Sequence, residues 1–134
     1  MLLKGNTITD QGGIAIAATV AHMPNLKQLC LRNNYFGDYT ANAIAGAAKH
    51  GHLLQLTHLS LIKENFIGWF GARGLNHMLR LRWVPGLVLL SLERKSISQQ
   101  DMISLYKTRL SLALGGQLVD FEDHNSDSDG ISDE

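Results

Sequence analysis

The chain has 134 residues, of which 45% are hydrophobic and 18% charged, so its composition is that of one soluble globular domain. Its formal net charge is zero, its apolar runs are only a few residues long, and Cys30 is its single cysteine. These features exclude a membrane-spanning helix and an internal disulfide framework, and they predict an intracellular, cytoplasmic protein.

One sequence frame recurs through residues 1–117 and predicts four units, near residues 1–25, 26–55, 56–86 and 87–117. The units open on Met1-x-Leu3-x-x-Asn6, Leu26-x-x-Leu29-x-Leu31-x-x-Asn34, Leu56-x-x-Leu59-x-Leu61 and Leu87-x-x-Leu90-x-Leu92. Alternating leucines predict a short strand with one buried face in each unit. A unit of this size cannot bury its apolar face alone, so the units are expected to stack on one another.

A helix is predicted after each strand. Asp10, Asp38 and Ser98 stand at the expected helix starts, and Asp101 follows Ser98 as the partner of a capping pair. Apolar residues then recur at helical spacing, and the pair Gly115-Gly116 predicts the end of the last helix. In the third unit Trp69 occupies the position of the helix-start aspartate.

The frame LxxLxLxxN followed by x-L-x-D-x-G-A-x-x-L resembles the ribonuclease-inhibitor class of leucine-rich repeats, over about residues 1–114. That class includes the Ran GTPase-activating proteins and the repeat domains of NOD-like receptors. The resemblance implies an α/β leucine-rich-repeat solenoid arc of about four strand–helix units. The parallel strands would line its concave face and the helices its convex face.

The function expected from this resemblance is a non-enzymatic protein–protein interaction module that binds a protein partner through its repeat surface. Two alternatives remain open. Ran GTPase activators also carry an acidic segment after their repeats, which leaves a GTPase-activator-like regulator as one alternative. The other is a truncated fragment of a longer repeat protein, because the chain begins inside a predicted strand.

The candidate partner-binding residues lie between the leucines and are expected to point away from the core. They are Lys4, Gln28, Cys30, Arg32, His58, Ser60, Ile62, Ser91 and Glu93, flanked by Leu2 and Leu89. Asn6, Asn34 and Asn65 are assigned a structural role, because a buried amide supplies a donor and an acceptor where the backbone turns out of a strand.

No catalytic, metal or cofactor site is predicted. His50, His52 and His58 have no further ligand at metal-binding spacing, and Gly68-x-x-Gly71-x-x-Gly74 lacks the Lys-Ser/Thr of a phosphate-binding loop. The glycines are therefore interpreted as packing positions. Nucleic-acid binding is not favoured, because the Lys and Arg residues are spread along the chain.

Trp69 and Phe70 allow two interpretations. The favoured one is local packing against Trp83 or Pro85, because large aromatic side chains usually join a nearby core. The other is an anchor for a partner, because aromatic residues and arginine dominate interface hot spots.

Charge divides the chain into two parts. Residues 1–117 hold all twelve Lys and Arg and five acids, a net charge of +7, and residues 118–134 hold the other seven acids. We expect residues 118–134 to form a disordered acidic tail, with Ser126 as a candidate phosphorylation site because Asp129 follows it by three residues. At the other end, the uncapped first repeat predicts end-to-end self-association.

Overall fold

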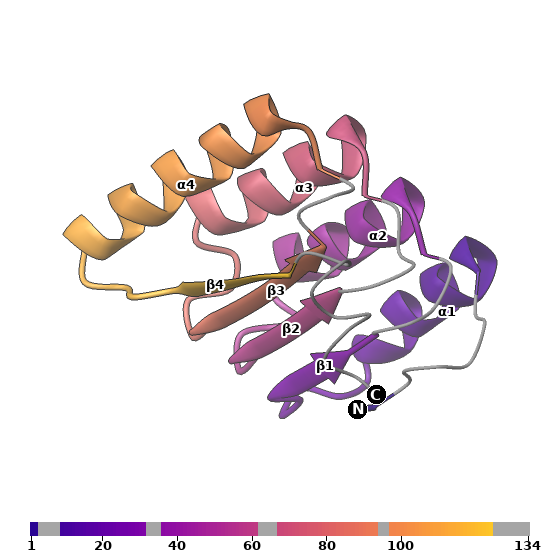
Figure 1. The fold of residues 1–134 in the computed structure, drawn as a ribbon. Coiled ribbons are helices and arrows are strands. Elements are labelled where there is room, and N and C mark those ends of the chain that lie inside the picture. The colour runs from indigo at the N-terminus through magenta and orange to yellow at the C-terminus, as the bar shows by residue number, and fades with distance from the viewer. Residues whose placement is uncertain (3–8, 32–35, 62–66, 94–96, 125–134) are drawn as a thin grey trace, which may run out of the picture.

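Strands and helices alternate along the chain (Figure 1). The computed structural model describes residues 1–2, 9–31, 36–61, 67–93 and 97–124; for residues 93 and 122–124 the description covers the backbone. The elements are α1 (Asp10–Val20), β1 (Gln28–Cys30), α2 (Asp38–Lys49), β2 (His58–Leu61), α3 (Trp69–Arg80), β3 (Leu89–Glu93), α4 (Gln99–Leu114) and β4 (Asp120–His124).

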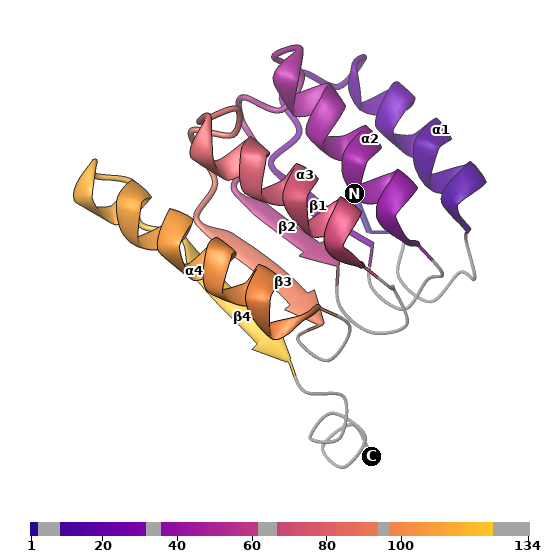
Figure 2. The ribbon, with the colours of Figure 1, turned by 90° about the horizontal axis from the view of Figure 1, so that it is seen from above.

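The four strands form one parallel sheet in the order β1-β2-β3-β4. Leu2 adds an isolated parallel bridge to Cys30 at the β1 edge. The four helices lie in one layer against one face of this sheet (Figures 1 and 2). The fold is therefore α/β, as the alternating leucine and helix patterns predict. Strands β1, β2 and β3 and the four helix starts lie at the expected places. The strand expected in the first unit falls mostly on residues 3–8, outside the described residues, and β4 was not expected.

The core lies between the sheet and the helix layer. Equivalent leucines of β1, β2 and β3 point into it, and each is at most 1% exposed: Leu29, Leu59 and Leu90. Burying one such side chain contributes about 1.5–3 kcal/mol. Helices α2, α3 and α4 face these leucines with Ile44, Leu75 and Leu105, which are equally buried. The period-two and helical patterns of the sequence thus meet in one apolar layer.

Each of the first two helix-start aspartates binds the next helix rather than its own. The Asp10 carboxylate accepts hydrogen bonds from Gly37 N (2.7 Å), Thr40 N (3.1 Å) and Thr40 Oγ1 (2.5 Å). The Asp38 carboxylate accepts one from Gly68 N at 2.6 Å. These carboxylates cap α2 and α3, whose free N–H groups and dipoles favour a negative charge.

Helix α4 has its own cap. Trp69 stands where Asp10 and Asp38 stand in the earlier helices, so α3 offers no carboxylate at this position. Instead Ser98 Oγ accepts a hydrogen bond from Asp101 N (3.1 Å) and donates one to the Asp101 carboxylate (2.9 Å). The predicted capping pair is confirmed. We infer that α4 needs a cap of its own because Trp69, unlike Asp10 and Asp38, has no carboxylate to offer the next helix.

Replacing Ser98 by alanine should lower the free energy of unfolding by about 1 kcal/mol, because the first turn of α4 loses its cap. Urea denaturation followed by circular dichroism measures the change. Ser111→Ala, at an exposed position of the same helix, is the matched control and should change stability by less than about 0.5 kcal/mol. Equal stabilities for the two variants would show that the cap contributes nothing.

The predicted boundary after residue 117 is wrong. Residues 120–124 form β4, which pairs with β3 in the register Leu90↔Phe121. Val119 is 3% exposed, and the Phe121 ring lies 5.7 Å from the ring of Tyr106. A disordered acidic tail is therefore excluded for residues 120–124, because pairing with β3 and two apolar contacts offset the cost of ordering them. Residues 125–134, including Ser126, lie outside the described residues.

Candidate functional site

One face of the parallel sheet is not covered by any helix of the described residues (Figure 2). Two rows of side chains cross this open face, as strand register shows. Gln28, His58 and Leu89 form the first row, and Cys30, Ser60 and Ser91 form the second. With Leu2, these residues line a hollow of about 200 Å³. The structure thus brings together six predicted residues of β1–β3 on one face: Gln28, Cys30, His58, Ser60, Leu89 and Ser91. The side chain of Glu93, the remaining predicted residue of β3, is not described.

The second row is small and weakly polar. Cys30 is a half-buried free thiol next to Ser60. The Ser60 hydroxyl oxygen is enclosed by protein atoms and has no hydrogen-bond partner among the described residues. An enclosed hydroxyl without a partner costs free energy. Leu2, at the end of this row, is 70% exposed.

His58 is held in a defined orientation in the first row. Thr57 Oγ1 donates its only proton to the carbonyl oxygen of Lys27 at 3.0 Å. The same oxygen lies 2.8 Å from His58 Nδ1, within hydrogen-bond distance. This contact orients the imidazole on the open face before any partner binds.

Several predicted residues cannot be placed. Seven of them lie outside the described residues: Lys4, Arg32, Ile62, Asn6, Asn34, Asn65 and Ser126. Glu93 belongs to β3, but only its backbone is described. The structural role of the three asparagines therefore stays a prediction. Partner binding by Lys4, Arg32, Ile62 and Glu93 stays one as well.

The packing interpretation of Trp69 and Phe70 is wrong. These residues begin α3, whereas Trp83 lies beyond its other end at Arg80. Trp69 is 62% exposed and Phe70 46% exposed, and the two rings meet edge to face at 5.7 Å. Tyr39, at the equivalent position of α2, is 67% exposed. Sequence reasoning singled out Trp69 and Phe70 and kept an anchor for a partner as the alternative, but it did not consider Tyr39.

The glycine positions of α3 are packing positions, as predicted. A Cβ atom on Gly71 would lie 2.6 Å from an Asp38 carboxylate oxygen, and one on Gly74 would lie 2.2 Å from the Asn42 side-chain oxygen. The Asn42 side chain itself donates to the carbonyl oxygen of Phe70 at 3.1 Å. Glycine is needed here because α2 and α3 approach closely.

At the sheet edge beyond β1, a hollow of about 570 Å³ is lined by Met1, Leu26, Gln28 and the turn Met23–Asn25. This is the edge at which self-association was predicted. The predicted end-to-end contact stays a prediction.

The described residues contain no group of three or more His, Cys, Asp or Glu side chains placed to hold a metal ion. His50 and His52 have ring centroids 6.3 Å apart. Within the same residues, every helix is too short or too polar to cross a membrane.

Comparison with known proteins does not assign the chain to a family. No family model matches it, and no significant match is found among curated proteins. The function is therefore inferred from the fold, from the open face of the sheet and from the exposed residues of α3.

Proposed function

We propose that the chain is a leucine-rich-repeat arc of about four strand–helix units, as the sequence frame implies. Recurrence of the same contacts at about the repeat interval supports this. The Asp10 carboxylate accepts from Gly37 N and the Asp38 carboxylate from Gly68 N, 27 and 30 residues later. Thr57 N donates to Lys27 O, and Val88 N donates to Thr57 O in the same way. Stacked repeats are expected to repeat their nearest-neighbour contacts in this way.

We further propose that the chain is a non-enzymatic protein-interaction module, and that it binds through the open face of the sheet. The observation that carries the proposal is the uncovered face itself. All-parallel sheets are normally covered on both faces. Here the helices cover one face, and no helix or strand of the described residues covers the other (Figures 1 and 2).

The chemistry of the open face suits a protein partner. It combines apolar groups at Leu2 and Leu89 with the oriented imidazole of His58 and the side-chain amide of Gln28. Such a face buries apolar area at its centre and orients the partner through a few polar groups. Because these residues lie on paired strands, little conformational entropy is lost when they bind.

Affinity capture from a cell extract, followed by reconstitution of each captured protein with the purified chain, tests the proposal. We expect at least one captured protein to bind directly, and its Kd to rise at least tenfold for the double variant Gln28→Glu, His58→Glu. Burying two uncompensated carboxylates at a contact centre disfavours binding by more than this factor.

The matched control is Leu110→Glu, Ser111→Glu, which adds two acidic residues at exposed positions of α4. It should bind as the unmodified chain does. If the open-face variant retains every direct interaction, or if no captured protein binds directly, protein binding through this face is wrong.

A further inference from the structure

The outer side of the helix layer carries a second surface, separate from the open face of the sheet. A groove of about 390 Å³ runs between α3 and α4. Its α3 wall presents three cationic or titratable side chains, and its α4 wall is polar with one acid. The lining side chains are Arg73, His77 and Arg80 on α3, and Gln100, Asp101 and Ser104 on α4.

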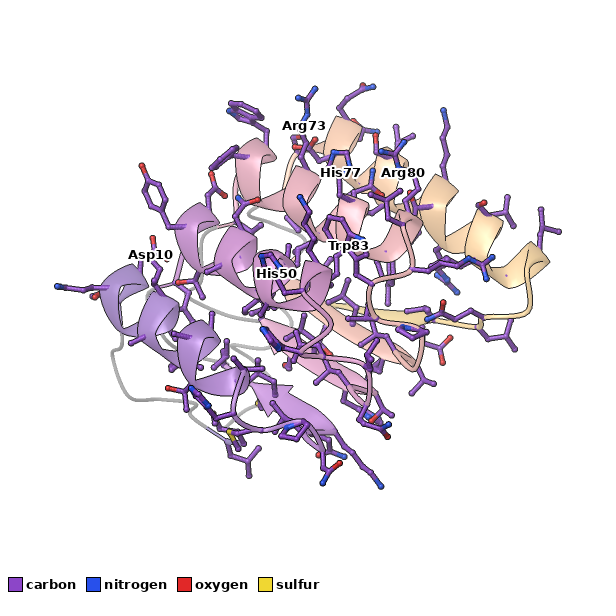
Figure 3. All side chains as sticks on the ribbon, turned by 180° about the vertical axis from the view of Figure 1, so that it is seen from behind. Asp10, His50, Arg73, His77, Arg80 and Trp83 are labelled. Atoms are coloured by element: carbon purple, nitrogen blue, oxygen red, sulfur yellow. The ribbon has the colours of Figure 1, made fainter. Side chains whose placement is uncertain are left out.

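The three α3 side chains follow one another along the helix at successive turns (Figure 3). Arg73 lies with its guanidinium carbon 5.5 Å from the centre of the Trp69 ring. Arg80 donates to His77 Nδ1 at 3.0 Å, since a guanidinium has no acceptor. Both arginines are exposed and are oriented by an aromatic ring and an imidazole.

Neither arginine is neutralised within the described part of the chain: no carboxylate there forms an ion pair with Arg73 or Arg80. The one acid in the groove, Asp101, accepts from Ser98 Oγ at 2.9 Å. Among the described residues, the two oriented guanidinium groups thus have no carboxylate partner. Each can bind a carboxylate of another molecule through two parallel hydrogen bonds.

The α3 start adds an apolar end to this cationic wall. Trp69 and Phe70 are exposed and in contact with each other, one turn before Arg73. Tryptophan and arginine are both among the residue types enriched at binding hot spots. The surface therefore offers an apolar contact followed by two anion-binding positions along one line.

We propose that this groove binds an extended acidic peptide segment of a partner protein. An apolar side chain of the peptide packs on Trp69 and Phe70, and two carboxylates pair with Arg73 and Arg80. Seven helical residues rise about 10.5 Å. In a peptide segment with the polyproline II conformation, residues three apart lie on the same side of the chain, about 9 Å from each other. The groove therefore selects acids three residues apart with an apolar residue on the Trp69 side.

The acidic residues that follow β4 do not fit this spacing. Asp120 and Asp123 are three positions apart, but both belong to β4, which pairs with β3. Within residues 125–134 the acids are Asp127, Asp129, Asp133 and Glu134, and no two of them are three positions apart. A polyanion such as nucleic acid is disfavoured by Asp101, which lines the opposite wall and would repel a continuous row of phosphates. A partner's acidic peptide is the occupant that matches both walls.

Fluorescence anisotropy with a synthetic peptide tests the inference on the full chain. The probe carries one leucine and two glutamates three residues apart, and a second probe carries glutamines in their place. We expect the acidic probe to bind, the glutamine probe to bind at least tenfold more weakly, and binding to weaken as salt rises. Arg73→Gln and Arg80→Gln should each raise the Kd about tenfold.

Two further variants separate this site from a general charge effect. Asp101→Asn should lower the Kd about twofold, because a like charge is removed from the opposite wall. Lys49→Gln removes an exposed cation at the end of α2 and should leave binding unchanged. Circular dichroism confirms that each variant is folded.

Each of three outcomes would overturn the inference. The first is equal binding of the acidic and glutamine probes, or unchanged binding by both arginine variants. The second is a tenfold gain in probe affinity for Asp127→Asn, Asp129→Asn, which would make the chain's own segment the occupant. The third is tighter binding of a single-stranded oligonucleotide with the same arginine dependence. None of these outcomes bears on the open face of the sheet, which the experiment does not alter.

Discussion

Replacing Gly13 by alanine should destabilise the fold by about 2 kcal/mol, although alanine is the better helix former. A Cβ atom on Gly13 would lie 2.2 Å from Thr40 Oγ1, 2.7 Å from Thr40 Cγ2 and 2.9 Å from Phe36 Cδ1. Thr40 and Phe36 are both fully buried, so neither can move aside cheaply. The new methyl group must push α1 away from α2 and disrupt the packing between these two helices.

Gly46→Ala is the matched control for this substitution. Gly46 lies inside α2, and no atom lies within 4 Å of the position that its Cβ would take. The gain in helix propensity should raise the free energy of unfolding by about 0.5–1 kcal/mol. Chemical denaturation should therefore shift the two midpoints in opposite directions. A Gly13→Ala protein as stable as the unmodified chain would contradict the close approach of α1 and α2.

Replacing Asp10 by alanine should lower the free energy of unfolding by about 2–3 kcal/mol. The carboxylate accepts three hydrogen bonds from Gly37 and Thr40, and its loss leaves the buried Thr40 hydroxyl and the first N–H groups of α2 without this acceptor. Asp38→Ala, which removes the hydrogen bond from Gly68 N, should cost about 1 kcal/mol.

Asp10→Asn is the control that separates hydrogen bonding from charge. Its side-chain oxygen can still accept from Gly37 N, so the loss should be smaller than for Asp10→Ala. Thermal and urea unfolding measure the series. If Asp10→Ala changes stability by less than about 0.5 kcal/mol, the carboxylate does not join the first two helices.

Local sequence patterns predicted the elements well, because their causes are local. Alternating leucines such as Leu59 and Leu61 require a strand with one buried face, and both are at most 1% exposed. Asp10 and Asp38 marked helix starts correctly. Their actual partners lie in the next helix, and capping rules that consider only the following residues could not reveal this.

Two features depended on contacts between distant residues. The acids of residues 120–124 favoured a disordered segment, but β3 offered an edge for pairing, and Arg109 places its guanidinium 5.6 Å from the Phe121 ring. The pattern Leu118-x-x-Phe121 repeats Leu87-x-x-Leu90 and could have indicated the strand. Trp69 was expected to pack near Trp83, but the length of α3 separates the two.

The open face of the sheet was predicted in part. Alternation within β1, β2 and β3 correctly placed Gln28, Cys30, His58 and Ser60 on the face opposite the core. The enclosure of the Ser60 hydroxyl and the contact of His58 Nδ1 with Thr57 Oγ1 depend on neighbouring strands and side chains, which no single-strand pattern contains. The exposed cationic groove likewise depends on how α3 and α4 lie together.

The rate at which a maleimide labels Cys30 tests binding through the open face most directly. Cys30 is the only cysteine of the chain and lies half-buried in the second row of this face. It therefore reports on one place without any substitution. With a directly binding partner at saturation, labelling should slow at least tenfold. An unchanged labelling rate in the saturated complex would contradict binding through the open face.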